Sequence, residues 1–406
     1  MERENIQILT EPLLAQEETS GHVTNGTRDG LACDSSSITL TLVLSTLIAV
    51  CGSYVFGTAL GYSSPSESGI MNDLGLSSAE YSVFSSILTI GGMLGAVLSG
   101  QVADFIGRKG AMWCSEIFCI IGWLAIVFSK DVWWLDLGRL SLGCGIGLLS
   151  YVVPVYIAEI TPKNRRGELT GLNMLLITCG QSVMFFSGTF VNWRILALIG
   201  TIPCIAQVLA LFFIPESPRW LAKTGRREYK SALQRFRGMN IDISQEAAEI
   251  KAYTETLKAL PKAGFIDLFQ WTYAYPVIVG VGLMIFQQFG GLNGFAFYGS
   301  AILESAGFPS KVGTQAMAVA QIPTTVLGVF LMDKVGRRPL LMASAAGTCL
   351  GCLLTGLAFF LQDLHQWKEV NSYSSVYWRI GISSIFFIRH GRNTMDYNVR
   401  DFSYYH

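Results

Sequence analysis

Three side-chain amides stand close together in the stretch Gln287-Gln288-Phe289-Gly290-Gly291-Leu292-Asn293. The surrounding apolar run is long enough to cross a bilayer, where each amide needs a partner or a water-filled cavity. Because a carboxamide both donates and accepts hydrogen bonds, such a cluster suits a neutral ligand rich in hydroxyl groups, as a sugar is, better than an ion. A single amide often only bonds a neighbouring helix. Three of them beside a Gly-Gly pair that loosens the helix favour a lined cavity instead.

The composition predicts a polytopic membrane protein. The chain has 406 residues, of which 51% are hydrophobic and 14% charged, and it is far more apolar than a soluble domain of that size. The formal net charge of zero gives no reason to expect a nucleic acid as partner. The nine cysteines and four histidines show no metal-ligand spacing, so neither a metal nor a cofactor is expected. An enzyme is not expected, because the spans lack the embedded groupings that catalysis would need.

Apolar segments long enough to span a bilayer as helices define the organisation of the chain. They predict an all-α fold with a six-helix N-terminal half over residues 38–214 and an incomplete, three-helix C-terminal half over residues 274–362. Residues 215–273 are expected to form a cytosolic loop with short helices, and residues 1–37 a disordered cytosolic tail. The predicted spans are residues 38–61, 81–102, 111–128, 132–156, 169–191, 195–214, 275–300, 314–332 and 340–361.

The orientation follows from the basic residues, which fall in every second linker. The connection from Ser63 to Glu80 contains no Lys or Arg, so the positive-inside rule places the N-terminus in the cytosol. Within the N-terminal tail, Leu9 and the pair Leu13 and Leu14 stand near an acidic residue. These leucines form a sorting signal or are incidental in a disordered tail, and both interpretations stay open.

An internal repeat indicates that the two halves are related. Asp104-Phe-Ile-Gly107-Arg108-Lys109 follows the second span of the first half, and Asp333-Lys-Val-Gly336-Arg337-Arg338 follows the second span of the second half. Duplicated halves that pack about a site at mid-membrane are the plan of many transporters.

Motifs along the chain resemble those of one transporter family. In order they are GQVADFIGRKG, GRLSLGCGIG, VPVYIAEITPKNRRGEL, PESPRWL, QQFGGLN and DKVGRRPL. Over residues 38–370 the ordered set resembles the sugar-porter branch of the major facilitator superfamily, and most specifically the plant monosaccharide transporters of the early-responsive-to-dehydration-six-like group. The resemblance implies a lipid-embedded protein of the vacuolar or plasma membrane that carries a hexose-like sugar by alternating access.

The resemblance also implies which residues form the sugar site and the outer gate. The family's amide positions fall on Gln181, Gln287, Gln288, Asn293 and Gln321. Tyr298 falls where relatives carry a tyrosine pair over the outer entrance; simple aromatic packing is the alternative for this residue.

Charged residues are expected at the cytosolic ends of the spans and look like an intracellular latch. Opposite charges there can hold the two halves together when the cavity faces outward and must separate when it faces inward. The alternative is that the basic residues only set topology, but that rule gives no role to the carboxylates. The expected latch residues are Asp104, Arg108, Arg139, Glu159, Arg165, Arg166, Glu216, Arg219, Asp333, Arg337 and Arg338.

One departure from the family bears on energetics. Proton-coupled plant sugar symporters carry an acid in the first span, because a buried carboxyl can take up and release a proton. Ala59 stands at that position here, and no other acid is expected well inside a predicted span, Asp136 being the nearest. Facilitated diffusion of the sugar is therefore expected.

The C-terminal region, residues 363–406, is too rich in charged residues for a spanning helix. Reading the codons of Ser372 to Tyr405 one base later permits a peptide that resembles the family's tenth helix. A one-base frame change near Asn371 in a full-length transporter is the expected origin. The alternative function is a transport-dead isoform or a sugar sensor, acting by association with full-length transporters.

Overall fold

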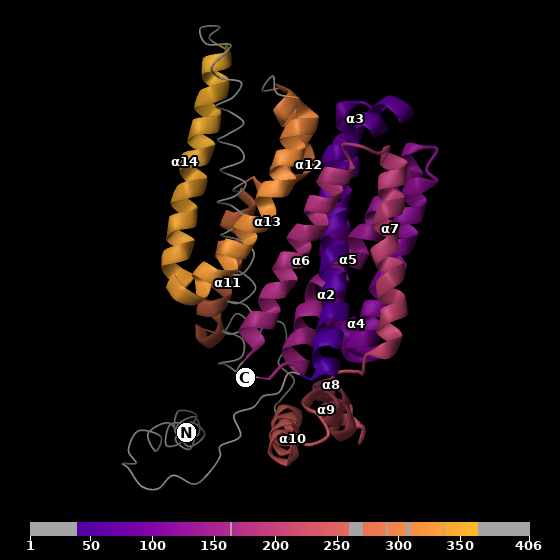
Figure 1. Ribbon diagram of the computed structural model, residues 1–406, viewed down its shortest axis with the longest axis vertical. Coiled ribbons are helices and arrows are strands. Elements are labelled where there is room, and N and C mark those ends of the chain that lie inside the picture. The colour runs from indigo at the N-terminus through magenta and orange to yellow at the C-terminus, as the bar shows by residue number, and fades with distance from the viewer. Residues whose placement is uncertain are drawn as a thin grey trace. The chain divides into compact units, whose positions relative to one another are not determined.

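A computed structural model describes residues 39–162, 165–259, 271–289, 291–305, 309–335 and 337–363. The leucines of the predicted sorting signal and the C-terminal region from residue 364 lie outside these residues. Within the described ranges the regular elements are helices (Figure 1).

The first half consists of long helices around a shared core. Short α3 lies at one end of these helices, which we call the α3 end, and α8 to α10 lie at the other, which we call the α8 end (Figure 1). The elements are α2 (Leu40–Gly61), α3 (Ser63–Leu74), α4 (Ser78–Val127), α5 (Val132–Ile160), α6 (Arg166–Ser187), α7 (Trp193–Ala210) and the 3₁₀ turn η2 (Leu211–Phe213).

The central loop and the second half continue the helical pattern. A helix covers every predicted span, although two of them differ in detail. α4 joins the second and third spans across a break at Gly107 (φ 89°, ψ 170°), and the seventh span is divided into two helices next to Gly291 (φ 78°). The elements are α8 (Pro218–Lys223), α9 (Tyr229–Arg237), α10 (Ser244–Ala259), α11 (Trp271–Phe289), α12 (Leu292–Ser305), α13 (Ser310–Val335) and α14 (Arg337–Asp363).

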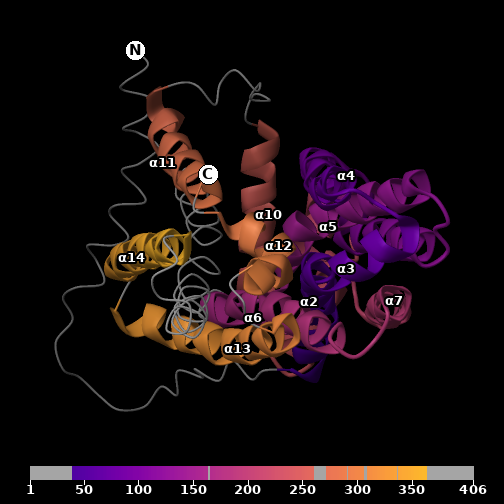
Figure 2. The same ribbon diagram turned by 90° about the horizontal axis from the view of Figure 1, so that it is seen from above.

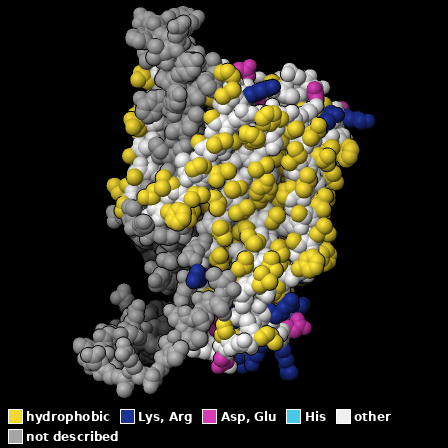
Figure 3. Space-filling model, viewed as in Figure 1, with side chains coloured by type: hydrophobic (Ala, Val, Ile, Leu, Met, Phe, Trp, Pro, Cys, Tyr) yellow, Lys and Arg dark blue, Asp and Glu magenta, His cyan; other side chains and the backbone are white. Residues whose placement is uncertain are grey.

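The lipid-facing surface is visible as a broad apolar belt between two charged ends (Figure 3). Among the described residues, five helices are long and apolar enough to cross a membrane: α2, α4, α5, α7 with η2, and α13. On α7 the exposed residues Leu198, Ile202, Ile205 and Leu209 follow helical spacing on one face. So large an exposed apolar surface fits a bilayer and not water.

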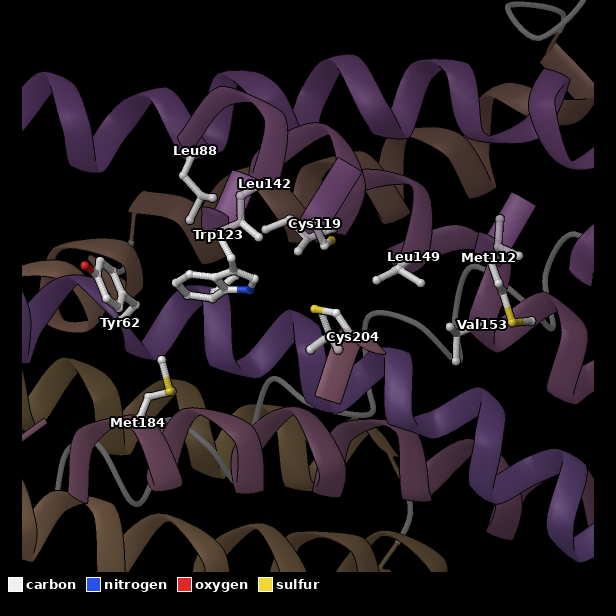
Figure 4. Packing of buried hydrophobic residues seen from close by; sticks show 14 of the residues in the cluster. Tyr62, Leu88, Met112, Cys119, Trp123, Leu142, Leu149, Val153, Met184 and Cys204 are labelled. Atoms are coloured by element: carbon white, nitrogen blue, oxygen red, sulfur yellow. The ribbon is translucent and has the colours of Figure 1, made fainter. Parts of the chain in front are cut away.

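The core of the first half depends on close contact between helix backbones. A Cβ atom added to Gly95 of α4 would lie 2.2 Å from the backbone oxygen of Cys144, and one added to Gly147 of α5 would lie 2.3 Å from that of Gly92. Only glycine fits at such distances. Aromatic side chains fill the space nearer the α3 end, where Tyr62 meets Trp123 edge to face with ring centroids 5.2 Å apart (Figure 4).

We expect Gly95→Val to destabilise the protein by about 3 kcal/mol, because the backbones of α4 and α5 are too close at this position to admit a side chain. Gly100→Val is the matched control on the same helix, since a Cβ atom there meets no other atom within 4 Å. Thermal unfolding in detergent measures both variants. Equal melting temperatures for the two would contradict this account of the packing.

Candidate functional site

Two of the predicted sugar-binding amides lie at the interface between the halves. Gln181 on α6 and Gln321 on α13 are 4% and 2% exposed. The hydroxyl of Ser182, next to Gln181, donates to Oε1 of Gln321 at 3.4 Å. The structure therefore places Gln321 against Ser182, the residue that follows Gln181 in the sequence.

A line of polar contacts runs along the whole α6–α13 interface. Besides Ser182 and Gln321, the amide of Gln315 donates to the hydroxyl of Thr189 (2.9 Å), and the hydroxyl of Thr325 donates to that of Thr178 (3.3 Å). We call these three pairs the polar seam. Because residue numbers rise along α6 as they fall along α13, the two helices are antiparallel, and Figure 2 shows them side by side. The two halves thus meet here through hydroxyl and amide groups, beside an apolar cluster around Phe185 of α6.

The remaining predicted amides lie where α11 ends and α12 begins. The backbone N–H of Gly291 donates to the carbonyl of Gln288 (3.1 Å) across the junction, and Gln288 is exposed. The side chains of Gln287 and Asn293 lie outside the part of the chain that the structure describes. Whether all five amides line one cavity therefore stays a prediction.

Tyr298 packs against the first half at the α3 end. Its ring meets that of Tyr81 edge to face, with centroids 6.5 Å apart, and its neighbours Ala296 and Phe297 belong to the core cluster of the first half. The backbone of Tyr298 departs from helical geometry (φ −117°, ψ 18°). α12 is therefore bent where it meets the other half.

Four of the expected latch residues meet at the α8 end. The guanidinium of Arg108 pairs with Asp104 (3.0 Å) and Glu159 (2.8 Å), and the hydroxyl of Ser217 donates to Glu159 (2.5 Å). Glu216, the fourth, lies beside Arg108. We call Asp104, Arg108, Glu159 and Glu216 the Arg108 cluster; its described contacts join α4, α5 and the residues that begin α8.

Glu216 closes the turn between the two spans of α4. Its carboxylate accepts backbone N–H groups of Arg108 (3.1 Å), Lys109 (3.1 Å) and Ser217 (2.9 Å). Burial raises the pKa of Glu216 above its ordinary value, and these N–H donors oppose the rise. Gly107 permits the approach, because it has positive φ and a Cβ atom there would lie 2.5 Å from the carboxylate.

The other latch candidates are placed less fully. Arg219 is half-buried on α8 and Arg165 is exposed just before α6. Lys223, which was not among the candidates, joins the cluster through Asp104 (2.9 Å). The side chains of Arg166, Asp333, Arg337 and Arg338 lie outside the described residues.

The expected place of Arg139 was wrong. Arg139 lies on α5 near the α3 end, twenty residues before Glu159, which is about 30 Å along a helix. Its guanidinium donates to the backbone oxygen of Ala59 (3.1 Å) and to the hydroxyl of Ser63, and it lies over the rings of Tyr62 and Phe84. The motif that contains Arg139 lies at the start of a span, whereas the other basic motifs lie just after the end of one. Arg139 was therefore assigned to the wrong end of the membrane.

The sequence interpretation also missed Glu116, an acid inside the third predicted span. It is 0% exposed, and neither carboxyl oxygen makes a hydrogen bond of normal geometry within the described part of the chain. The thiols of Cys204 on α7 and Cys51 on α2 are among its polar neighbours, and Cys204 faces Cys119 across the core (Figure 4). An acid in the run Ser115-Glu116-Ile117 was readable from the sequence.

We expect Arg108→Gln to cost about 3–5 kcal/mol of stability, because the side chains of Arg108 and Glu159 are only 8% and 14% exposed and the carboxylate would lose its cation. Lys223→Gln is the control, with an expected cost of about 0.2–1 kcal/mol, since Lys223 and Asp104 are half-exposed. Thermal unfolding at low salt measures both. A loss for Lys223→Gln as large as that for Arg108→Gln would show that burial does not set the strength of these pairs.

Comparison with known proteins places these features in a family. The profile described as sugar (and other) transporter matches residues 22–388. The chain is 57% identical over 320 residues to "Sugar transporter ERD6-like 7" of Arabidopsis thaliana, covering 79% of this chain and 69% of the relative. It is 49% identical over 355 residues to "Sugar transporter ESL1" of the same plant, covering 87% and 76%.

Solved structures show the same fold. The partially occluded inward open conformation of the xylose transporter XylE from E. coli superposes with a TM-score of 0.74 at 22% identity, covering 89% of this chain and 85% of that one. XylE bound to 6-bromo-6-deoxy-D-glucose gives a TM-score of 0.67 at 22% identity. The helices described above therefore follow the fold of the major facilitator superfamily.

Proposed function

Because the chain belongs to the sugar transporter family and is a multi-pass sugar transporter of the ERD6-like group, not an enzyme, we propose that it carries a monosaccharide by alternating access between its two helical halves. The observation that carries this proposal is the polar seam, where the buried amide of Gln321 on α13 accepts the hydroxyl of Ser182 on α6, the residue that follows the buried Gln181. Amides from both halves can hydrogen-bond one hydroxyl-rich solute, and these hydrogen bonds change when the halves move relative to each other.

The sugar site that we propose consists of Gln181 and Gln321 at the seam together with Gln287, Gln288 and Asn293 at the α11–α12 junction. The division of the seventh span supports it, because backbone freed from helical bonding is tolerated at membrane depth where it lines a cavity. The α11–α12 break falls next to Gly291, among these amides. Tyr298 is proposed as a gate, since its ring closes on Tyr81 of the other half.

The α8 end is proposed to face the cytosol, in the vacuolar or plasma membrane. Lys and Arg gather at the α8 end, in the loop of α8 to α10, as the positive-inside rule requires of a cytosolic face. The latch role of the Arg108 cluster is part of the same proposal. Its charges lie where α4, α5 and the α8 loop meet, so they are placed to change partners when the second half approaches.

We expect Gln321→Ala to raise the KM for hexose uptake by about 10- to 100-fold, because the sugar would lose a buried amide partner. Uptake of radiolabelled hexose into lipid vesicles that contain the chain measures it. Gln315→Ala is the matched control, since it removes another amide of the same helix at the end of the seam. A KM for Gln321→Ala equal to that of Gln315→Ala would refute the proposed site; sugar binding without uptake in the parent chain would favour the sensor or transport-dead alternative.

Facilitated diffusion is the proposed energetics. The guanidinium of Arg139 donates to the backbone carbonyl of Ala59 and to the hydroxyl of Ser63. Ala59 occupies the position where symporters carry an acid, so Arg139 finds its acceptors there without a carboxylate. Glu116 does not alter this, because its neighbours Cys204 and Cys51 belong to helices of the same half. A group coupled to transport must change its surroundings between the two states.

We expect an imposed proton gradient to leave the final internal sugar concentration equal to the external one, in the parent chain and in Glu116→Gln alike. Vesicles with clamped internal pH measure this at equilibrium, and the gradient dissipated by an ionophore is the control. Accumulation of sugar above the external concentration in the parent chain would instead demonstrate symport. If Glu116→Gln then no longer accumulated sugar, Glu116 would be the residue that couples proton and sugar movement.

A further inference from the structure

Two serines join the halves at the α3 end. The backbone N–H of Ser300 on α12 donates to Oγ of Ser64 on α3 (2.9 Å), and Oγ of Ser300 donates to the carbonyl of Ser64 (2.5 Å). Ser64 is 2% exposed. A Cβ atom on the neighbouring Gly299 would lie 3.3 Å from Oγ of Ser64, so the small residue allows this approach. Figure 2 shows α12 beside α3.

The carboxyl group of Glu67 completes the contact. Its Oε2 lies 3.4 Å from Oγ of Ser300. Oγ of Ser300 is placed to donate both to the Ser64 carbonyl (2.5 Å) and to Oε2 of Glu67 (3.4 Å), but a hydroxyl has one hydrogen to share between them. Because the Ser64 carbonyl is the nearer acceptor, an ionised Glu67 would receive only a weak hydrogen bond from Ser300. A protonated Glu67 can donate its own hydrogen to Oγ of Ser300, so the geometry fits the neutral carboxyl better.

We propose that Ser64, Glu67 and Ser300 form an acid-sensitive clasp that closes the α3 end of the transport path. The inference rests on the proposed alternating access, because a path that opens to each side in turn must part α3 from α12 at one stage. Protonation of Glu67 tightens the clasp and favours the closed state; ionisation favours opening. Acidity on the α3 side then changes the rate of transport, and no proton crosses the membrane with the sugar.

The surroundings of Glu67 act in the same direction. Burial raises the pKa of Glu67 above its ordinary value, more than a donating Ser300 hydroxyl would lower it, and the charge of Glu304 on α12 adds to the rise. Among the described residues, the phenol of Tyr81 on α4 also interacts with Glu67; it donates to the carbonyl of Ser63, whose hydroxyl is bonded by Arg139 of α5. Opening hydrates Glu67 and carries Glu304 away, so the pKa of Glu67 falls.

The direction of the pH effect follows from these two states. Glu67 binds its proton more tightly in the closed state than in the open one. Its contribution to the closed state is therefore complete below the pKa of the open state, and it is lost as pH rises through the higher pKa of the closed state. Acid on the α3 side holds the clasp shut.

A pair of residues outside the clasp reports whether the α3 end is closed. Thr189 and Gln315 meet across the halves at this end. With both replaced by cysteine in the full chain in lipid vesicles, the rate of disulfide formation on oxidation follows the closed fraction; the linked peptide is quantified by mass spectrometry. The reference at each pH is the same cysteine pair combined with Glu67→Gln, which mimics the protonated acid. The pH dependence of the thiols themselves is the same in both proteins, so it cancels in the ratio of their rates.

We expect the rate relative to this reference to be near one at about pH 5 and to fall about fivefold by about pH 8, as the loss of one hydrogen bond implies. Ser300→Ala should slow the reaction at both pH values. Asp131→Asn, which removes an exposed acid at the same end, should follow the parent pair. A ratio that does not change with pH, or a Ser300→Ala variant as fast as the parent, overturns the clasp.

Sugar uptake by the same vesicles separates this inference from the proposed function. A pH-dependent ratio supports the clasp even where uptake is absent, in which case only the transport proposal fails. Normal hexose uptake with a ratio that does not respond to pH overturns the clasp and leaves the transport proposal standing.

Discussion

A polar group inside this bundle has no water to bond, so it must find its partner within the protein. The first half meets this demand mostly within itself. Arg139 donates to the backbone of α2, the hydroxyl of Ser53 bonds Asn173, and the phenol of Tyr62 donates to the carbonyl of Trp193. Because the glycines of α4 and α5 also bring the helix backbones into contact, sliding inside this half would break many interactions at once. Motion is therefore left to the places where the halves meet.

The polar contacts between the halves are of a weaker kind than the buried ion pair within the first half. The described polar contacts along the seam and at the clasp are hydrogen bonds of side-chain and backbone groups, each worth about 1 kcal/mol net, and apolar packing around Phe185 and Phe297 accompanies them. The buried ion pair of Arg108 with Glu159, which costs several kcal/mol to break, lies between α4 and α5 of the same half. This distribution suits a transporter, since the halves keep their internal structure while their junction exchanges partners.

Much of the fold could be predicted from the sequence, because the length of an apolar run and the placement of basic residues are physical requirements of a bilayer. The same reasoning foresaw a break in the seventh span, which falls next to Gly291, and it foresaw that Asp104, Arg108, Glu159 and Glu216 lie at one end. It failed for Arg139, because a motif does not state how deep in the membrane its residue lies. It missed Glu116, although that acid stands inside a predicted span, and it had no means to find Ser64 with Ser300, whose contact depends on how the halves meet.

The positions of Glu116 and Glu67 argue that depth in the membrane does not by itself make an acid functional. Glu116 lies in mid-span, but its described neighbours on α2 and α7 belong to the same half and move with it, so opening and closing leave its surroundings unchanged. Glu67 lies at the end of the bundle and is only half-buried, yet its partners Ser300 and Glu304 are on the other half. A proton can bias a conformational equilibrium only where the two states bind it differently. By that criterion the acid able to respond is the one at the junction.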